Sequence, residues 1–84
     1  MPKVPVTVYT LPVCVQCNQT KRLMDRLGIR YVEVELTAEK AEEFKAQGFS
    51  AAPIVTTDVK IWSGFRMSKI QSLADYIRSM EKEN

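Results

Sequence analysis

The feature that most restricts the fold of this chain is a pair of cysteines where a strand gives way to a helix. The stretch from Thr10 to Cys17 reads TLPVCVQC and holds the chain's only two cysteines, Cys14 and Cys17, in a Cys-x-x-Cys spacing. At the first turn of a helix the backbone N–H groups lack partners and the dipole is positive, so a thiolate is stabilised there. We expect Cys14 to lie exposed at the helix start and Cys17 to lie one turn further along, shielded by the helix. This arrangement supplies an attacking and a resolving thiol for reversible dithiol–disulfide exchange.

The same two cysteines are open to three other interpretations. A structural zinc site needs four ligands, usually Cys or His; with two cysteines and no histidine, zinc would require carboxylates or a second copy of the chain. A purely structural disulfide would close a short loop and stabilise the fold by roughly 2 kcal/mol. Two inert thiols in the core are the third interpretation, because free Cys is a common core residue. The strand-to-helix position favours redox chemistry over all three.

Size and composition limit the chain to one small domain. Its 84 residues, of which 45% are apolar, suffice for a single core, and we expect one domain over residues 1–84. The net charge of +2 comes with dispersed basic residues, which indicates neither a nucleic acid nor a membrane as partner. No apolar run could span a bilayer, and residues 1–8 lack the regions of a signal peptide. We therefore expect a cytoplasmic protein, and in that reducing compartment a cysteine pair is more often catalytic or metal-binding than structural.

Hydrophobic periodicity predicts seven elements in the order β-α-β-α-β-β-α. The expected strands lie over residues 3–10, 29–36, 54–57 and 60–63. The expected helices lie over residues 15–27, 38–47 and 68–80. The opening β-α-β unit makes its two strands parallel, the closing hairpin is antiparallel, and Cys14 follows the carboxyl end of the first strand. The prediction is an α/β protein with a four-stranded mixed sheet and three helices.

Three short motifs in this order of elements resemble those of a known family. They are Cys14-Val15-Gln16-Cys17, Ala46-Gln47-Gly48-Phe49 and Trp62-Ser63-Gly64-Phe65-Arg66. Over nearly its whole length the chain resembles the thioredoxin fold in its small glutaredoxin-like form and, within that form, the NrdH-redoxins. The resemblance implies a monomeric dithiol–disulfide oxidoreductase that donates electrons to class Ib ribonucleotide reductase. It further implies no bound cofactor, since the electrons come from NADPH through thioredoxin reductase.

The resemblance also implies roles for individual residues. Cys14 matches the nucleophile and Cys17 the resolving thiol. Pro53 matches a cis-proline that faces the active site, and the backbone of Ala52 pairs with the extended segment of the partner. The block from Trp62 to Arg66 matches one that braces the loop before Pro53. The expected partner-binding residues are accordingly Leu11, Pro12, Val13, Ala52, Pro53, Trp62, Ser63, Gly64, Phe65 and Arg66.

Without the resemblance, three of these residues have ordinary interpretations. Pro53 would be a strand-entry proline, Trp62 a partly exposed surface aromatic and Phe65 a core residue. Two positions also depart from the family pattern. Leu11 stands where a basic residue is frequent, and Met67 follows the arginine of the block where a proline is common, so the pre-set first turn of the last helix is lost.

Two other functions remain open at this stage. A glutathione-dependent glutaredoxin needs positive groups near the nucleophile for the carboxylates of glutathione. This chain has neither a lysine at position 11 nor the Gly-Gly-x-x-Asp helix start of glutaredoxins, so this function ranks second. A non-enzymatic module would bind zinc or an iron–sulfur cluster between the cysteine pairs of two chains.

Overall fold

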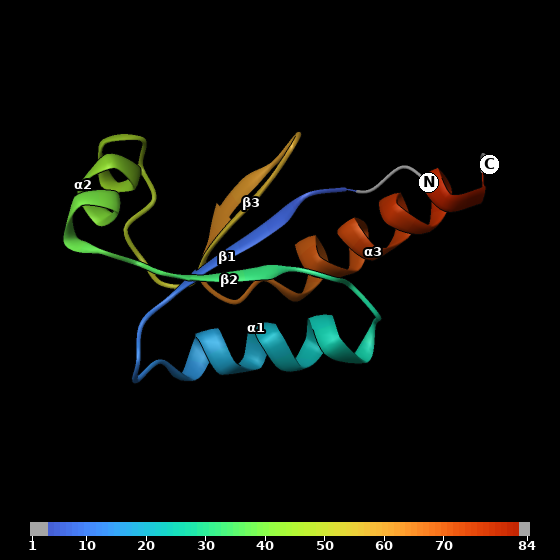
Figure 1. Cartoon of the computed structure of the whole chain (residues 1–84), viewed down its shortest axis with the longest axis horizontal. Coiled ribbons are helices and arrows are strands. Elements are labelled where there is room, and N and C mark those ends of the chain that lie inside the picture. Colours follow the sequence, from blue (N-terminus) through green and yellow to red (C-terminus); the bar gives the residue numbers. More distant parts are fainter. Residues whose placement is uncertain (1–3, 83–84) are drawn as a thin grey trace.

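The computed structural model describes residues 4–82 and consists of one mixed sheet with helices on both faces (Figure 1). The strands are β1 (Val6–Thr10), β2 (Val32–Glu35), β3 (Ile54–Thr57) and β4 (Ile61–Ser63). The helices are α1 (Val15–Arg26), α2 (Ala38–Ala46) and α3 (Met67–Lys82). This order confirms the predicted β-α-β-α-β-β-α arrangement. Within residues 4–82, no helix has both the length and the apolar character needed to cross a membrane.

The pairing of the strands brings three separate segments to one end of the sheet. The strand order is β2-β1-β3-β4, with β1 parallel to β2 and the other two pairs antiparallel. Tyr9 near the end of β1 pairs with Ile54 at the start of β3, and Ile54 pairs with Ser63 at the end of β4. Three segments therefore meet at the same end of the sheet: the loop after β1, the residues before β3 and the residues after β4.

The first two strands are shorter than predicted. Pairing of β1 begins at Val6, after Pro5, which has no N–H to donate to a ladder; residue 3 lies outside the described residues. β2 begins at Val32 rather than at Ile29, because Ile29 is buried and its N–H donates to the carbonyl of Met24 at 2.9 Å. Ile29 thus belongs to the turn that closes α1, not to the sheet.

The main core lies between the sheet and the helices α1 and α3. Val6 and Val8 of β1, Met24 of α1 and Ile70 of α3 are among its buried members. They occupy the positions that the alternation in the first strand and the helical spacing of the first and last helices predict. A smaller core on the other face joins α2 to the sheet through Phe44, whose ring meets that of Tyr9 edge-on with centroids 5.0 Å apart.

The ends of the helices follow their predicted signals. Thr37 caps α2, its hydroxyl accepting from the N–H of Lys40 at 3.2 Å. The motif over residues 46–49 ends this helix, since the N–H of Phe49 donates to the carbonyl of Phe44 at 2.9 Å. Gly28 ends α1 with φ of +75°, a left-handed conformation that glycine adopts without a steric cost.

Candidate active site

Cys14 and Cys17 are joined by a disulfide, and their Cα atoms are 5.2 Å apart. Cys14 is the N-cap of α1, with an extended backbone, and the N–H of Cys17 donates to its Sγ at 3.1 Å. The first turn of α1 holds no acidic side chain. The helix start therefore directs an N–H group and the positive end of its dipole at the sulfur of Cys14, which stabilises negative charge there when the disulfide is reduced.

The two sulfurs differ in their access to solvent. Cys17 is 1% exposed, because the helix α1 to which it belongs shields it from solvent, as expected. Cys14 is half-buried, whereas the sequence predicted an exposed side chain. The order of exposure is nevertheless the predicted one, since Cys14 is the more accessible of the two cysteines.

Pro53 lies at the same edge of the sheet, and its carbonyl is held by the block that follows β4. The Ala52–Pro53 peptide bond is cis, as predicted. The carbonyl of Pro53 accepts from the N–H of Gly64 at 2.8 Å. Gly64 has φ of +80°, a conformation that side chains with a Cβ rarely adopt. The expected bracing of this loop is thus made by a backbone hydrogen bond.

Gln16, inside the Cys-x-x-Cys motif, connects that motif to the same block. Its Oε1 accepts from the N–H of Phe65 at 2.8 Å, across 49 positions of sequence. A Cβ added at Gly64 would lie 3.1 Å from this oxygen, so the close approach also requires glycine there. Sequence reasoning missed this contact, because only the sheet topology reveals that Gln16 faces Phe65.

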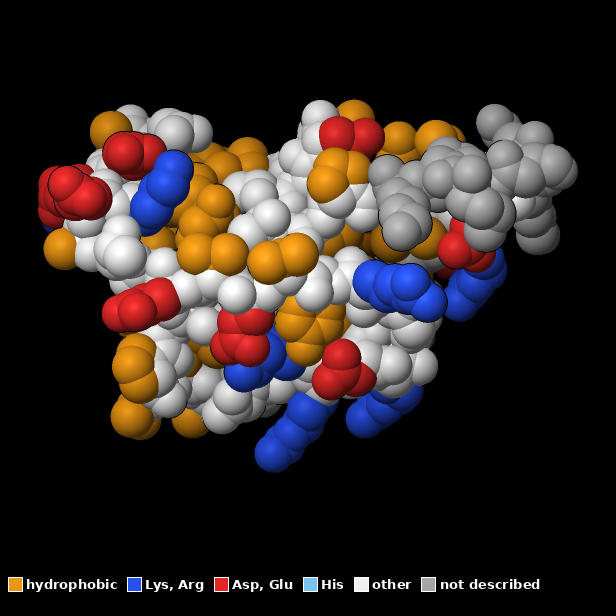
Figure 2. Space-filling model, viewed as in Figure 1, with side chains coloured by type: hydrophobic (Ala, Val, Ile, Leu, Met, Phe, Trp, Pro, Cys, Tyr) orange, Lys and Arg blue, Asp and Glu red, His pale blue; other side chains and the backbone are white. Residues whose placement is uncertain are grey.

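The residues expected to bind a partner differ in how far they reach the surface. Leu11, Pro12, Val13 and Arg66 are exposed, Ala52, Ser63 and Phe65 are half-buried, and Pro53, Trp62 and Gly64 are buried. Val13 is 95% exposed, and Val15, which was not among the expected residues, is 73% exposed. Figure 2 shows apolar side chains at the end of the molecule where Figure 1 places the connection from β1 to α1.

The interpretation of Trp62 as a partly exposed surface aromatic is wrong. It is 3% exposed and belongs to the main core, where it lies among residues of the sheet and of α3. With so little of its surface exposed, Trp62 is not a main contact for a docking protein. Any contribution of Trp62 to partner binding is therefore indirect, through the position of the residues that follow it.

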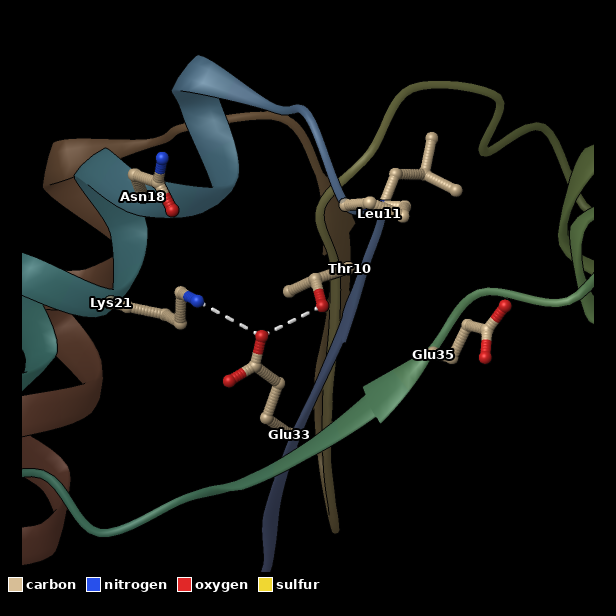
Figure 3. Close-up of a pocket in the computed structure, with 7 residues that line it drawn as sticks. Thr10, Leu11, Asn18, Lys21, Glu33 and Glu35 are labelled. Carbon is tan, nitrogen blue, oxygen red and sulfur yellow. Dashed lines mark hydrogen bonds and ion pairs between the residues drawn. The ribbon is translucent and has the colours of Figure 1, made fainter.

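A polar hollow adjoins the cysteine loop on the side of β2 (Figure 3), with a volume of about 420 Å³. Its lining residues are Thr10, Leu11, Pro12, Asn18, Lys21, Glu33 and Glu35. The carboxylate of Glu33 accepts from Lys21 Nζ and from Thr10 Oγ1, both at 2.9 Å. These two hydrogen bonds, that from Lys21 first, hold the pKa of Glu33 below its ordinary value. Sequence reasoning assigned Glu33 only to the polar side of a strand.

Among residues 4–82, no group of three or more Cys, Asp or Glu side chains is placed to hold a metal ion.

Comparison with known proteins agrees with this geometry. A glutaredoxin family model matches residues 6–62 and so ends just before Ser63. The glutaredoxin-like protein NrdH of Salmonella typhimurium is 41% identical over 70 residues, which are 81% of this chain and 86% of the relative. NrdH of Lactococcus lactis is 37% identical over 71 residues, 82% of this chain and 99% of the relative.

One solved structure extends the comparison to three dimensions. The structure of NrdH-redoxin from Escherichia coli superimposes with a TM-score of 0.77 at 39% identity, covering 82% of this chain and 93% of that protein. It was described as the structural basis for a thioredoxin-like activity profile in a glutaredoxin-like protein. The match confirms the predicted thioredoxin fold in its small glutaredoxin-like form.

Proposed function

We propose, from the premise that this chain belongs to the glutaredoxin family and within it to the NrdH-type redoxins, that it is a thioredoxin-like electron donor. The chain is a thiol–disulfide oxidoreductase. In the proposal it receives electrons from NADPH through thioredoxin reductase, and it passes them to class Ib ribonucleotide reductase. It acts as a monomer in the cytoplasm, with Cys14 and Cys17 as its only redox groups.

The proposed reaction moves two electrons in two exchange steps. The Cys14 thiolate attacks one sulfur of a disulfide in the partner, forming a mixed disulfide and releasing one partner thiol after protonation. Cys17 then loses its proton and attacks Cys14 Sγ, which forms the Cys14–Cys17 disulfide and releases the second partner thiol. The N–H of Cys17, which donates to Cys14 Sγ, lowers the energy of the attacking thiolate.

The observation that carries the choice of reductant is that Gln16 already occupies the N–H of Phe65. A small anionic tripeptide such as glutathione would need free donors or cations near Cys14 for its carboxylates. The N–H of Gly64 is bonded to Pro53, and position 11 is a neutral leucine. Arg66 is an exposed cation beside this edge.

The surface around Cys14 favours a protein as the partner. Leu11, Val13 and Val15 are exposed apolar side chains around the disulfide. Ala52 would offer its backbone to an extended segment of the partner, next to this apolar rim. Such a surface suits docking of another protein's active-site segment, in which apolar anchors are buried by the partner.

A coupled assay that follows NADPH oxidation tests the proposal. The oxidised protein is supplied with thioredoxin reductase in one arm and with glutathione plus glutathione reductase in the other. We expect turnover in the first arm to be faster by about tenfold or more, a ratio that corresponds to about 1.4 kcal/mol in transition-state stabilisation. Cys14→Ser and Cys17→Ser should abolish turnover in the thioredoxin reductase arm.

A second measurement addresses the acceptor. The reduced protein is supplied as the sole electron donor to a purified class Ib ribonucleotide reductase, and deoxyribonucleotide formation is measured. Faster turnover with glutathione in the coupled assay would contradict the proposal and favour a glutathione-dependent glutaredoxin. Failure to support the ribonucleotide reductase would leave a thioredoxin-like reductant with a different acceptor.

A further inference from the structure

A second cavity lies between the β3–β4 hairpin and α3, and we refer to it as the hairpin groove. Its volume is about 300 Å³, which is near the lower end for small-molecule sites. Its lining residues are Thr57, Val59, Lys60, Trp62, Lys69, Ser72, Leu73 and Tyr76. Neither the cysteines nor the exposed apolar rim around them contributes to it. The hairpin groove is therefore separate from the redox site.

The floor of the hairpin groove is apolar, and one of its lining residues, Trp62, carries an unpaired donor. Trp62 and Leu73 are 3% and 6% exposed, and Tyr76 is half-buried beside them. The indole Nε1 of Trp62 is buried and has no hydrogen-bond partner among residues 4–82. Buried polar groups in native proteins are nearly always paired, so an unpaired one calls for an explanation. An acceptor atom of a ligand that enters next to Trp62 would supply the missing partner.

The rim of the groove is positively charged. Lys60 from the hairpin and Lys69 from the first turn of α3, together with Ser72, also line an adjoining hollow of about 140 Å³, to which Ser68 contributes. None of the described residues that line either cavity is acidic. Among the described residues neither ammonium group is in an ion pair. The positive end of the α3 dipole adds to the attraction for an anion at this point.

We propose that the hairpin groove is a binding site for a small organic anion. An aromatic or short aliphatic body lies against Trp62, Leu73 and Tyr76, where it is removed from water. A carboxylate, sulfonate or phosphate group lies between Lys60 and Lys69, and an acceptor atom of the ligand pairs with the indole N–H of Trp62. A small molecule fits better than a protein segment, because the apolar floor and the charged rim are confined to two small adjoining cavities of about 300 and 140 Å³.

Trp62 makes the proposal directly testable, because it is the only tryptophan in the chain. Protein labelled with ¹⁵N therefore gives one indole N–H signal in a two-dimensional NMR spectrum. The oxidised protein is titrated with 1-naphthalenesulfonate and, in parallel, with neutral 1-naphthalenemethanol. We expect the sulfonate to shift the indole signal and the amide signals of Lys60 and Lys69 saturably, and to bind more tightly than the alcohol.

Charge variants separate a built site from a general attraction. Lys60→Gln combined with Lys69→Gln should weaken sulfonate binding by about tenfold, since two partly exposed charge contacts are lost, and should leave binding of the alcohol unchanged. The matched control, Lys40→Gln combined with Lys45→Gln on α2, makes the same change in net charge outside the groove and should leave both affinities unchanged.

Two results would overturn the proposal. The first is an indole signal that does not move saturably with the sulfonate. The second is equal weakening by the two pairs of lysine variants, which would mean that only the net charge matters. The Lys60 and Lys69 variants should keep the NADPH-coupled turnover of the wild type, so the outcome does not depend on the proposed redox partners.

Discussion

Two buried threonines near the cysteines differ in whether their hydroxyls are paired. Thr10, at the end of β1, is 7% exposed and its hydroxyl donates to the carboxylate of Glu33. Thr20 lies one helical turn after Cys17 and is fully buried, and its Oγ1 has no hydrogen-bond partner in the described part of the chain. A buried hydroxyl without a partner has lost its hydration without compensation, whereas a hydrogen bond to a charged group is stabilising.

Replacing each threonine by valine should therefore change stability in opposite directions. We expect Thr20→Val to raise the free energy of unfolding by about 1 kcal/mol, because an unpaired polar group is removed from the core. Thr10→Val should lower it by about 1 to 2 kcal/mol, because a hydrogen bond to a carboxylate is lost. Urea denaturation of the oxidised proteins at neutral pH measures both values. Loss of stability in both variants would show that the Thr20 hydroxyl does have a partner.

At the scale of elements, α1 and the connection from β4 to α3 are held together at the active site by a few polar contacts. The side chain of Gln16 reaches the N–H of Phe65, and the N–H of Gly64 reaches the carbonyl of Pro53. These contacts fix the block after β4 against both the cysteine motif and the proline loop. They bring together two of the three motifs that carry the family resemblance, residues 14–17 and 62–66, which are far apart in sequence.

A comparison of two glycines tests this packing. Gly28 and Gly64 have φ of +75° and +80°, so alanine costs a similar backbone strain of about 1 to 2 kcal/mol at either position. At Gly28 the new Cβ meets nothing within 4 Å, whereas at Gly64 it lies 3.1 Å from Oε1 of Gln16. We expect Gly64→Ala to cost about 1 kcal/mol more, because the Gln16–Phe65 hydrogen bond is disturbed.

A double-mutant cycle supplies the control for this prediction. In a Gln16→Ala background, the additional cost of Gly64→Ala should disappear, since the contacting oxygen is gone. The free energy of unfolding of the single and double variants, measured in urea, gives the coupling. An additional cost that persists without the Gln16 side chain would mean that another group opposes a side chain at position 64.

At the scale of the whole molecule, the two faces of the sheet are covered unequally. The face toward α1 and α3 carries the main core, while the other face has the smaller core with α2. Val32 and Val34 of the edge strand β2 remain 63% and 37% exposed. Acidic side chains gather over α2 in Figure 2. Residues next to the active site contact both cores, since Phe65 packs against the main core and Ala52 against the smaller one.

The sequence predicted this architecture where the signals are local. The strand-to-helix junction placed Cys14 at the start of α1, and the helical spacing of apolar residues placed Ile70 in the core. The family resemblance predicted the cis bond before Pro53, which the residues alone would not have indicated, because cis bonds before proline are uncommon.

The features that were missed depend on contacts between distant segments. The burial of Trp62 could not be predicted, because a strand of three residues has too short a pattern to identify its inward face. The contact of Gln16 with Phe65 requires the order of the strands, and the pairing of Glu33 with Lys21 requires the packing of α1 against the sheet edge. The hairpin groove likewise joins Lys60 and Lys69 only in the folded chain.

Glu33 links three elements of the molecule and makes its free energy of unfolding depend on pH in a direction that can be worked out. Its carboxylate lies on the edge strand β2 and accepts from Lys21 on α1 and from Thr10 on β1. Both bonds favour the ionised form, so the pKa of Glu33 is lower in the folded protein than in the unfolded chain. The unfolded chain then binds the proton more readily, and the stabilisation is complete above the unfolded pKa and lost as the pH falls through the folded one.

We therefore expect the difference in unfolding free energy between the wild type and Glu33→Gln to depend on pH. It should be constant from about pH 7 to about pH 5.5 and should shrink below about pH 4. Its size should stay below about 1 kcal/mol, since the Glu33 side chain is 43% exposed and screened by solvent. The matched control is Glu35→Gln, because the side chain of Glu35 points away from Glu33 and Lys21 in Figure 3. Its difference from the wild type should change less with pH. Urea denaturation at each pH measures the three proteins, and a Glu33→Gln difference that stays constant down to about pH 3 would contradict the assignment of these bonds to the ionised carboxylate.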